Sequence, residues 1–414
     1  MQLPYHGVRA HIRFGWYAVK IGLASLYRQV LGGTRFIGVT GSSGKTTTTQ
    51  LIGAFLATQG PCRISDMPTN RPENVAGTIF TIRPRHRFCV HELGGSEPQR
   101  IAKSVAMFRP HIGVVTRVSY DHYSAFRSLE ATAREKGRLV EALPANGTAV
   151  LNADEPRVLA MGERTRAQVI PYGLSEEAMV RGADLVSAWP EPLSLTVAYE
   201  GTRLRVETQL LGEHWAPAVL AALATGIALG LPLEEAAGAL GEVPPVYCRL
   251  SPHPMADGVT FIQDSWKAAL YTFPASLRFL ETARASRKVI IIGTISDSPG
   301  SASPRYRQVA QQALKVADQV IFVGRWAQSA MKRVSPEDAP RLLAFDNIYK
   351  LRPFLRDFLT PGDLVLLKGS ASVDHLERLE LDWEKEFPCW RLNCKRMMLC
   401  TECRYRHRPF VPAS

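Results

Sequence analysis

The stretch GVTGSSGKTTTT, from Gly38 to Thr49, decides how the first part of this chain folds. A standard phosphate-binding loop has the spacing G-x-x-x-x-G-K-[ST], which requires a glycine at position 39, where this chain has valine. An apolar run of β type, residues 35–40, precedes the loop, and residues 46–60 have a helical pattern. A strand, a glycine-rich turn and a helix in this order favour a phosphate loop over an ordinary Gly/Ser turn.

The residue types in the loop are suited to holding phosphate groups. Gly41 and Gly44 allow backbone N–H groups to curl around an anion, and the N-terminus of the following helix adds its positive dipole end. Lys45 is placed to reach a β- or γ-phosphate, and the Thr46 hydroxyl is placed to reach Mg²⁺. The expected nucleotide-binding residues of the loop are Gly41, Ser42, Ser43, Gly44, Lys45, Thr46 and Thr47.

The length and composition of the chain limit the expected number of domains and the expected kinds of partner. A length of 414 residues predicts two or three domains, and 46% hydrophobic with 21% charged residues is an ordinary soluble composition. The net charge of +12 permits nucleic acid, an anionic membrane or anionic substrates as partners and selects none of them. We find no signal peptide, and the uncharged segment 215–233 is rich in Ala and contains two prolines, which favours a buried helix over a membrane span.

The order of apolar runs predicts an α/β chain with two sheets. Residues 8–32 have the pattern of a basic amphipathic helix, which we expect to pack on the domain that follows, with a membrane surface as the alternative. Strands alternate with helices from residue 35 to about 143, which predicts a parallel sheet. Short β-like runs in 148–211 predict a smaller antiparallel elaboration, and residues 215–240 return to helix. After a linker at Pro244-Pro245, four more strands predict a second α/β domain.

The motifs along the chain resemble those of Mur ligases, the ATP-dependent peptide ligases of cell-wall synthesis. The loop TGSSGKTTT has the variant spacing of that family, and VHELGGSEPQRI resembles its segment with a Mg²⁺-binding glutamate, here Glu92. HIGVVTRVSYDHYSAF resembles the segment that ends in a metal-binding histidine, His122, and AREKGRLVEAL is similar to the segment whose lysine is Lys136. LNADEPRV resembles the N-x-D segment of the family.

The second half of the chain continues the resemblance in the family's order. YCRL resembles the interdomain arginine motif and implies Arg249, and FIQDSWKAALYTFPASLRFL resembles the ribose-contacting aspartate segment of MurF-type enzymes, implying Asp264. GDLVLLKGS resembles the third-domain K-G-S motif with Lys368. The resemblance implies a P-loop parallel-sheet ATPase domain and a Rossmann-like α/β domain. The implied division is an N-terminal helix at 1–33, an ATP-binding domain at 34–245, a ligase domain at 246–385 and a Cys-rich basic tail at 386–414.

The resemblance implies an enzyme that uses ATP and Mg²⁺ to join a carboxylate to an amine or amino acid through an acyl phosphate. Lys45 and Arg249 would supply positive charge to the phosphates, because phosphoryl transfer needs positioning and charge neutralisation. Thr46 and Glu92 would hold Mg²⁺, a hard ion that prefers oxygen ligands. His122 would help to hold a second ion, and Lys136, carbamylated in many Mur ligases, would support it as an anion. The implied site residues are therefore Lys45, Thr46, Glu92, His122, Lys136, Arg249 and Asp264.

The chain also departs from the family pattern. Trp215 and Ala218 stand where the family has two asparagines, and the acidic L-G-D-M-x-E-L-G is replaced by IIGTISDSPG. About 34 residues precede the first core strand, so the domain that binds a UDP-sugar is not expected and neither is a UDP-muramoyl substrate. Two alternatives stay open: amidation with ammonia from a partner glutaminase, and a nucleotide-binding regulatory protein that has lost ligation. The expected substrates are small-molecule or peptide carboxylates and amines, and the expected location is the cytoplasm.

The end of the chain carries a cluster of cysteines, CWRLNCKRMMLCTEC. Four thiolates this close in sequence can close a tetrahedral Zn²⁺ site, with His407 as a substitute ligand; an iron–sulfur cluster and ordinary thiols are the alternatives. The tail is also basic, so a partner protein, a carrier or an anionic substrate is a candidate there, while nucleic acid is not expected. The expected zinc ligands are Cys389, Cys394, Cys400 and Cys403.

Overall fold

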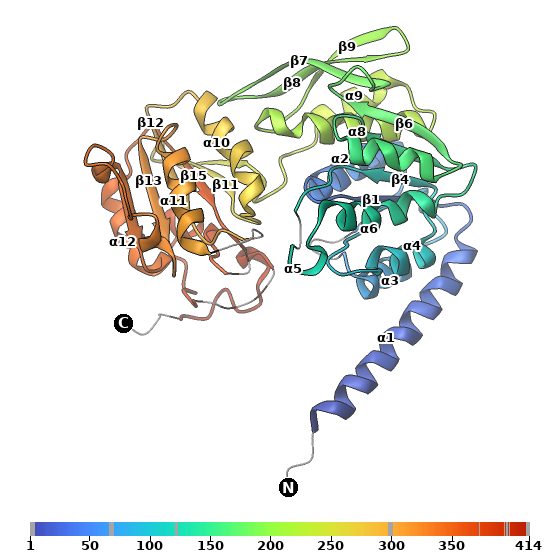
Figure 1. Ribbon diagram of the computed structural model, residues 1–414, viewed down its shortest axis with the longest axis horizontal. Coiled ribbons are helices and arrows are strands. Elements are labelled where there is room, and N and C mark those ends of the chain that lie inside the picture. The colour runs from blue at the N-terminus through green and yellow to red at the C-terminus, as the bar shows by residue number, and fades with distance from the viewer. Residues whose placement is uncertain are drawn as a thin grey trace. The chain divides into compact units, whose positions relative to one another are not determined.

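The computed structural model divides the chain into two compact units, each described by itself (Figure 1). It describes residues 5–65, 70–120, 123–296, 301–371, 373–392, 394, 396 and 398–410, without the side chains of 5–15 and 123–124. The first unit contains Met1–Asp184, Leu195–Glu207 and Ala216–Val243; the second contains Leu185–Ser194, Thr208–Trp215 and Pro244–Ser414. The main boundary lies immediately before Pro244, at the position of the expected linker.

The first unit is built on a parallel sheet, as the alternation of strands and helices predicts. Among the described residues the sheet has nine strands in the order β2-β3-β1-β4-β5-β6-β7-β8-β9. The pairs from β2 to β7 are all parallel. The strands are β1 (Arg35–Thr40), β2 (Cys62–Ile64), β3 (Phe88–Glu92), β4 (Ile112–Val115), β5 (Thr148–Asn152), β6 (Gln168–Gly173), β7 (Val180–Ala188), β8 (Glu191–Tyr199) and β9 (Thr202–Glu207).

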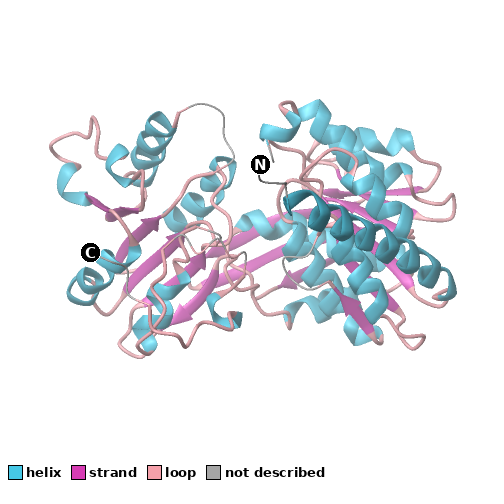
Figure 2. Ribbon diagram, turned by 90° about the horizontal axis from the view of Figure 1, so that it is seen from below, coloured by secondary structure: helices cyan, strands magenta, loops and turns pink. Residues whose placement is uncertain are grey.

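Helices cover both faces of this sheet (Figure 2). On one face α2, α8 and α9 pack against one another, and on the other α3, α4 and α6 pack together. The expected buried helix is α8, and its residues from Ala218 to Gly226 are all buried. The helices are α1 (Tyr5–Val30), α2 (Lys45–Gln59), α3 (Pro72–Thr81), α4 (Arg100–Phe108), α5 (Tyr123–Phe126), α6 (Leu129–Glu141), α7 (Pro156–Leu159), α8 (Ala216–Ala228) and α9 (Leu233–Gly241).

The prediction of an antiparallel elaboration over residues 148–211 is wrong for its first half. The run TAVLN forms β5, which pairs in parallel with β4, and QVIPYG forms β6, which pairs in parallel with β5. Only β7, β8 and β9 are joined by two-residue connections of hairpin length. A short apolar run has the same pattern in a buried parallel strand and in an antiparallel strand, so the sequence could not separate the two.

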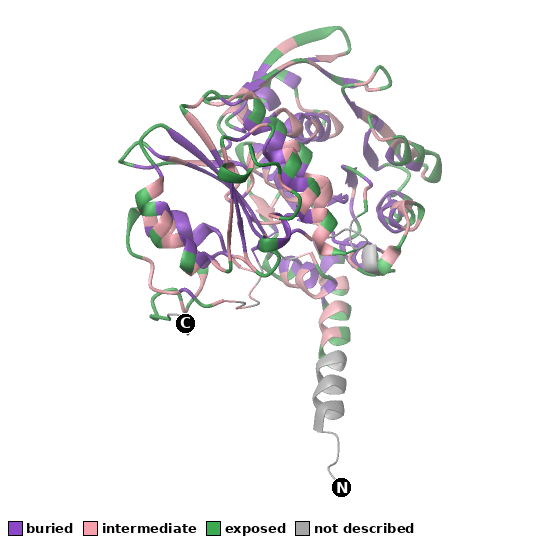
Figure 3. Cartoon of the chain, turned by 60° about the vertical axis from the view of Figure 1, so that its left-hand side comes forward, coloured by how far each residue is buried: buried purple, intermediate pink, exposed green. Residues whose placement is uncertain are grey.

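The N-terminal helix α1 packs on the first unit, as expected. The side chain of Arg28 is buried, donates to the carbonyls of Phe108 and Arg109, and stacks 3.6 Å from the centroid of the Phe36 ring. Much of the described surface of α1 is nevertheless exposed (Figure 3). Contact of α1 with a membrane surface stays a prediction, and among the described residues no helix has the length and apolar character to cross a membrane.

The second unit is a smaller α/β domain, and its described residues contain the four expected strands and two more. Its sheet has the order β10-β11-β15-β12-β13-β14, in which β10 is antiparallel to β11 and the other pairs are parallel. The strands are β10 (Ser251–Pro254), β11 (Thr260–Asp264), β12 (Arg287–Ile292), β13 (Gln319–Val323), β14 (Leu342–Phe345) and β15 (Asp363–Lys368). The helices are α10 (Phe273–Thr282), α11 (Ala302–Ala313), α12 (Ile348–Phe358) and α13 (Glu377–Glu384).

Candidate functional site

The phosphate loop connects the end of β1 to the start of α2 and requires glycine at its first position. Gly41 has φ 151°, and a Cβ there would lie 1.9 Å from Oγ1 of Thr116. No other residue fits this space without moving its neighbour, because the contact is far shorter than van der Waals distance. Gly44, at φ 79°, is the residue that precedes the first turn of α2. The shifted glycine of the sequence motif is therefore a steric requirement.

The segment that follows β4 braces the loop. Ser42 N donates to the carbonyl of Arg117 at 2.7 Å, and Ser119 N donates to the Ser42 hydroxyl at 2.9 Å. The hydroxyl of Thr116 donates to the Ser43 carbonyl at 2.6 Å. The expected metal ligand His122 comes shortly after this segment in the sequence but lies outside the described residues.

Two lysines from distant elements meet at one carbonyl of the loop. Lys45 Nζ donates to the Gly41 carbonyl at 2.8 Å, and Lys136 Nζ, from α6, donates to the same oxygen at 2.9 Å. Lys136 is only 2% exposed. Two ammonium groups this close repel each other, so the arrangement is suited to an anion beside them or to the loss of one positive charge.

A group of oxygen donors lies at the start of α2. The hydroxyl of Thr46 donates to Glu92 Oε2 at 2.7 Å, and Asn70 Nδ2 donates to Glu92 Oε1 at 2.9 Å. The hydroxyl of Thr47 is buried and has no hydrogen-bond partner among the described residues. A hydroxyl beside a carboxylate is a donor set that fits Mg²⁺. Sequence reasoning missed Asn70, because a single asparagine near the start of a helix is also a common turn residue.

The N-x-D segment, Asn152 to Asp154, makes hydrogen bonds to backbone groups of neighbouring segments. Asn152, at the end of β5, donates through Nδ2 to the carbonyl of Thr116 at 2.8 Å. Asp154 accepts from the backbone N–H groups of Leu174 and Ser175, each at 2.8 Å. These contacts position backbone segments, so the two residues have a structural role here.

The site residues of the second unit centre on an ion pair. Asp264, at the end of β11, accepts from Lys368 Nζ at 2.6 Å and from the Ser276 hydroxyl at 2.6 Å. Burial lowers the pKa of Lys368, and the neighbouring Asp264 carboxylate opposes that shift. Arg249 lies with its guanidinium carbon 6.0 Å from the Trp266 ring centroid. Contact of Asp264 with a ribose stays a prediction.

Trp215, one of the two positions that depart from the family pattern, forms an aromatic pair with its neighbour His214. The rings of His214 and Trp215 have centroids 4.5 Å apart, and the Trp215 indole N–H is buried with no hydrogen-bond partner among the described residues. Burial lowers the pKa of His214 to about 4, and nearby Asp264 opposes this. The imidazole is therefore neutral near pH 7.

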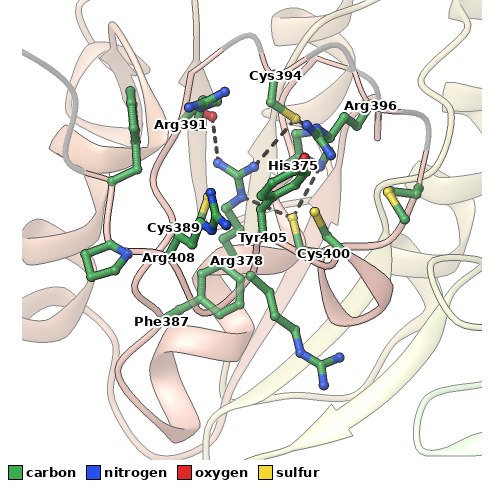
Figure 4. A pocket seen from close by; sticks show the side chains of 15 residues that line it. His375, Arg378, Phe387, Cys389, Arg391, Cys394, Arg396, Cys400, Tyr405 and Arg408 are labelled. Carbon is green, nitrogen blue, oxygen red and sulfur yellow. Dashed lines mark hydrogen bonds between the residues drawn. The ribbon is translucent and has the colours of Figure 1, made fainter.

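The tail forms a separate cavity of about 300 Å³ in the second unit (Figure 4). All of the expected zinc ligands line it, together with His375 and Arg378. Sequence reasoning missed both of these residues, because they follow the K-G-S motif and lie outside the cysteine cluster. The cavity's lining includes Cys389, Cys394, Cys400 and Cys403.

The comparisons with known proteins find Mur ligases. Residues 39–226 match the family model of the Mur ligase middle domain. The UDP-N-acetylmuramoyl-tripeptide--D-alanyl-D-alanine ligase of Mycobacterium leprae is 28% identical over 384 residues, covering 86% of this chain and 74% of that protein. The enzyme of the same name from Escherichia coli is 27% identical over 308 residues, covering 73% of this chain and 67% of that protein.

Solved structures of Mur ligases share the fold. A crystal structure of MurF from Acinetobacter baumannii has a TM-score of 0.83 at 22% identity, covering 89% of this chain and 80% of that one. MurF from Thermotoga maritima in complex with ADP has a TM-score of 0.76 at 22% identity, covering 89% and 84%. The relatives are named as ligases, and one structural neighbour is solved in complex with ADP. Residues 39–226 match a Mur ligase middle domain, and over most of its length the chain is similar to Mur ligases in sequence and fold.

Proposed function

We propose that the protein activates a carboxylate as an acyl phosphate and transfers the acyl group to an amine. A carboxylate oxygen attacks the γ-phosphorus of ATP and ADP leaves; the amine then attacks the acyl carbon, phosphate leaves and the amine nitrogen loses a proton. The observation that carries the proposal is the contact of Lys45 and Lys136 with one carbonyl of a braced phosphate loop. Two cations at this position are suited to the charge of a transferring phosphoryl group.

The residues of the first unit have distinct roles in this proposal. Lys45 neutralises the phosphates, and the backbone N–H groups of the loop hold them at the N-terminus of α2. The Thr46 hydroxyl and the Glu92 carboxylate, 2.7 Å apart, are the oxygen donors that would hold Mg²⁺. The ion would supply further charge neutralisation when bound. His122 is proposed as a ligand of a second ion, as the family resemblance implies.

Lys136 is proposed to carry a carbamate. Its amine is buried and shares the Gly41 carbonyl with Lys45, so an ammonium at both positions is electrostatically unfavourable. A carbamate converts the side chain into an anion whose oxygens suit a hard metal ion. The like-charge contact in the structure is the support for this assignment.

The second unit is proposed to hold other parts of the nucleotide. Arg249 would neutralise phosphate charge, and Asp264 would accept a hydrogen bond from the ribose. The ion pair between Asp264 and Lys368 keeps the carboxylate oriented.

The names of the relatives suggest the first amine to test. The relatives are named as ligases that add D-alanyl-D-alanine, so that dipeptide heads a panel of amines that also includes amino acids and ammonia. We expect ADP release that requires both a carboxylic acid and an amine, with a matching amount of amide product by mass spectrometry. If every pair of acid and amine gave ADP but no amide product, the ligase proposal would be contradicted.

The phosphate loop gives a direct test of the chemistry. Lys45→Ala should abolish ATP turnover, because a bound triphosphate loses its main cationic partner in the loop. Lys103→Ala is a matched control, because Lys103 is an exposed lysine of the same unit. The measurement is the rate of ADP release by both variants. Turnover by Lys45→Ala close to that of Lys103→Ala would refute the assignment of the loop.

A further inference from the structure

The cavity in the tail is walled by two stretches of chain. The tail supplies the cysteines, the segment that leads into α13 supplies His375, and the first turn of α13 supplies Arg378 (Figure 4). His375, Arg378 and Cys400 are 1%, 2% and 5% exposed, so the inner wall of the cavity is buried. Nothing in the ligase chemistry proposed above uses these residues.

The histidine in this wall is oriented as a metal ligand usually is. Its Nδ1 lies 3.1 Å from Glu377 Oε1, and its Nε2 lies 2.8 Å from Cys394 Sγ. A carboxylate that accepts one ring N–H fixes the tautomer and leaves the other nitrogen as a free electron-pair donor. In His375 that donor nitrogen faces the sulfur of a tail cysteine.

A second sulfur lies close to the same histidine and carboxylate. Cys400 Sγ is 3.5 Å from His375 Nδ1, and one side-chain donor atom from each of His375, Glu377 and Cys400 lies within 4.8 Å of the other two. Glu377 is fully buried, and its Oε2 has no hydrogen-bond partner among the described residues. A buried carboxylate oxygen without a partner is costly, and a nearby cation removes that cost.

The buried arginine is placed to stabilise thiolates. Arg378 donates through Nε to Cys400 Sγ at 3.1 Å and through Nη2 to Cys394 Sγ at 3.9 Å. A thiol is a weak acceptor, whereas a metal-bound thiolate carries negative charge and accepts N–H groups well. The guanidinium therefore suits the deprotonated, metal-bound form of these two cysteines.

We propose that the cavity binds one soft divalent metal ion, of which Zn²⁺ is the best match, through His375, Cys394, Cys400 and Cys403. The C-x-x-C pair of Cys400 and Cys403 is a usual arm of such sites, and a set of three cysteines with one histidine is a common structural zinc site. Each thiol releases its proton to solvent as its sulfur binds the metal. Glu377 orients His375 and is not a ligand.

This ligand set differs from the four cysteines expected from the sequence. Cys389 forms a backbone bridge with Phe410, and Figure 4 shows it across the Arg378 guanidinium from Cys394 and Cys400. In the proposed site His375 is a ligand and Cys389 is not. The metal then joins the tail to the segment after β15, where the Asp374 carboxylate accepts from the backbone of Thr294 and Ser370, at 2.7 and 2.8 Å.

The test is the metal content of the full chain, purified without chelator from zinc-supplemented medium. We expect about one zinc per chain in the unmodified protein, and loss of zinc in His375→Ala and in Cys400→Ser. Cys389→Ser should keep its zinc, and so should Cys62→Ser, a control that changes a half-buried free cysteine of the other unit.

A second measurement distinguishes the loss of a metal ligand from the failure of a variant to fold. His375→Cys replaces the imidazole by another soft ligand and should retain zinc, and Co²⁺ bound to it should show a stronger thiolate charge-transfer band than Co²⁺ in the unmodified chain. Protein without metal, or with iron and its own visible band, would overturn the proposal. Loss of zinc in Cys389→Ser with retention in His375→Ala would replace the proposed ligands by the four cysteines.

Discussion

The phosphate loop of the first unit and the tail cavity of the second are assembled from different lengths of chain. The loop is seven consecutive residues, 41–47, whose shape follows from backbone geometry at Gly41 and Gly44. The cavity joins residues 375–378 to residues 389–410, and the Arg378 guanidinium links the two stretches through the Arg391 carbonyl and the Cys400 sulfur. A local site of the first kind depends on single backbone positions, whereas a site of the second kind depends on packing elsewhere in its unit.

After the loss of Lys45, the largest expected effect concerns Lys136, whose side chain contacts the Gly41 carbonyl of the loop from α6. If it carries a carbamate, Lys136→Ala should lose roughly 100- to 1,000-fold in ligation rate, the usual cost of removing one charge-stabilising group. Acetate or formate in the buffer should partly restore the rate by occupying the vacated space.

Lys136→Arg distinguishes a carbamate from a simple cation. Arginine keeps the positive charge and cannot form the carbamate, so this variant should stay inactive with or without acetate. The measurement is the ligation rate of both variants at several acetate concentrations. Full activity of Lys136→Arg would mean that the position supplies only a positive charge.

The next effect concerns the packing that holds the tail. Trp390 is 2% exposed, and its ring centroid lies 5.2 Å from the Arg352 guanidinium carbon and 5.9 Å from the Tyr349 ring. Trp390→Ala should lower the free energy of unfolding of the second unit by about 3 kcal/mol. It should also reduce the zinc content while ATP binding by the loop is unchanged.

Trp326→Ala is the matched control for this change, because Trp326 lies in the same unit and is 42% exposed. Calorimetry and metal analysis on both variants provide the comparison. If Trp390→Ala kept its zinc and its stability, the cavity would be a local site like the phosphate loop.

The smallest expected effect is the difference in stability between substitutions at the two glycines of the loop. Gly41→Ala places a methyl group against the Thr116 side chain and should cost about 2 kcal/mol more in stability than Gly44→Ala. At Gly44 a Cβ would make only an ordinary contact, 4.0 Å from Thr116 Cβ, so the left-handed backbone is the main strain and costs about 1 kcal/mol. Chemical denaturation of both variants measures the difference, and equal stabilities would show that the loop moves to relieve the contact.

Much of the fold could be predicted from the sequence, because its signals are local. The run RFIGVT and the helix after Lys45 are where they were expected, and the α/β class is confirmed. The parallel pairing of β5 and β6 could not be predicted, because an apolar run does not specify its neighbour. The motif also could not predict the hydrogen bonds between Ser42 and the segment after β4.

For the candidate sites, the sequence by itself determined which residue types are present: a glycine-rich loop with its lysine, a carboxylate in Glu92, and a cluster of cysteines. The tertiary structure alone decided which of them meet. It placed Lys136 on the same carbonyl as Lys45, and it placed His375 beside the tail cysteines. The physical reason is that a backbone turn is fixed by neighbouring residues, whereas a contact between distant side chains is fixed by strand order and core packing, which no local pattern encodes.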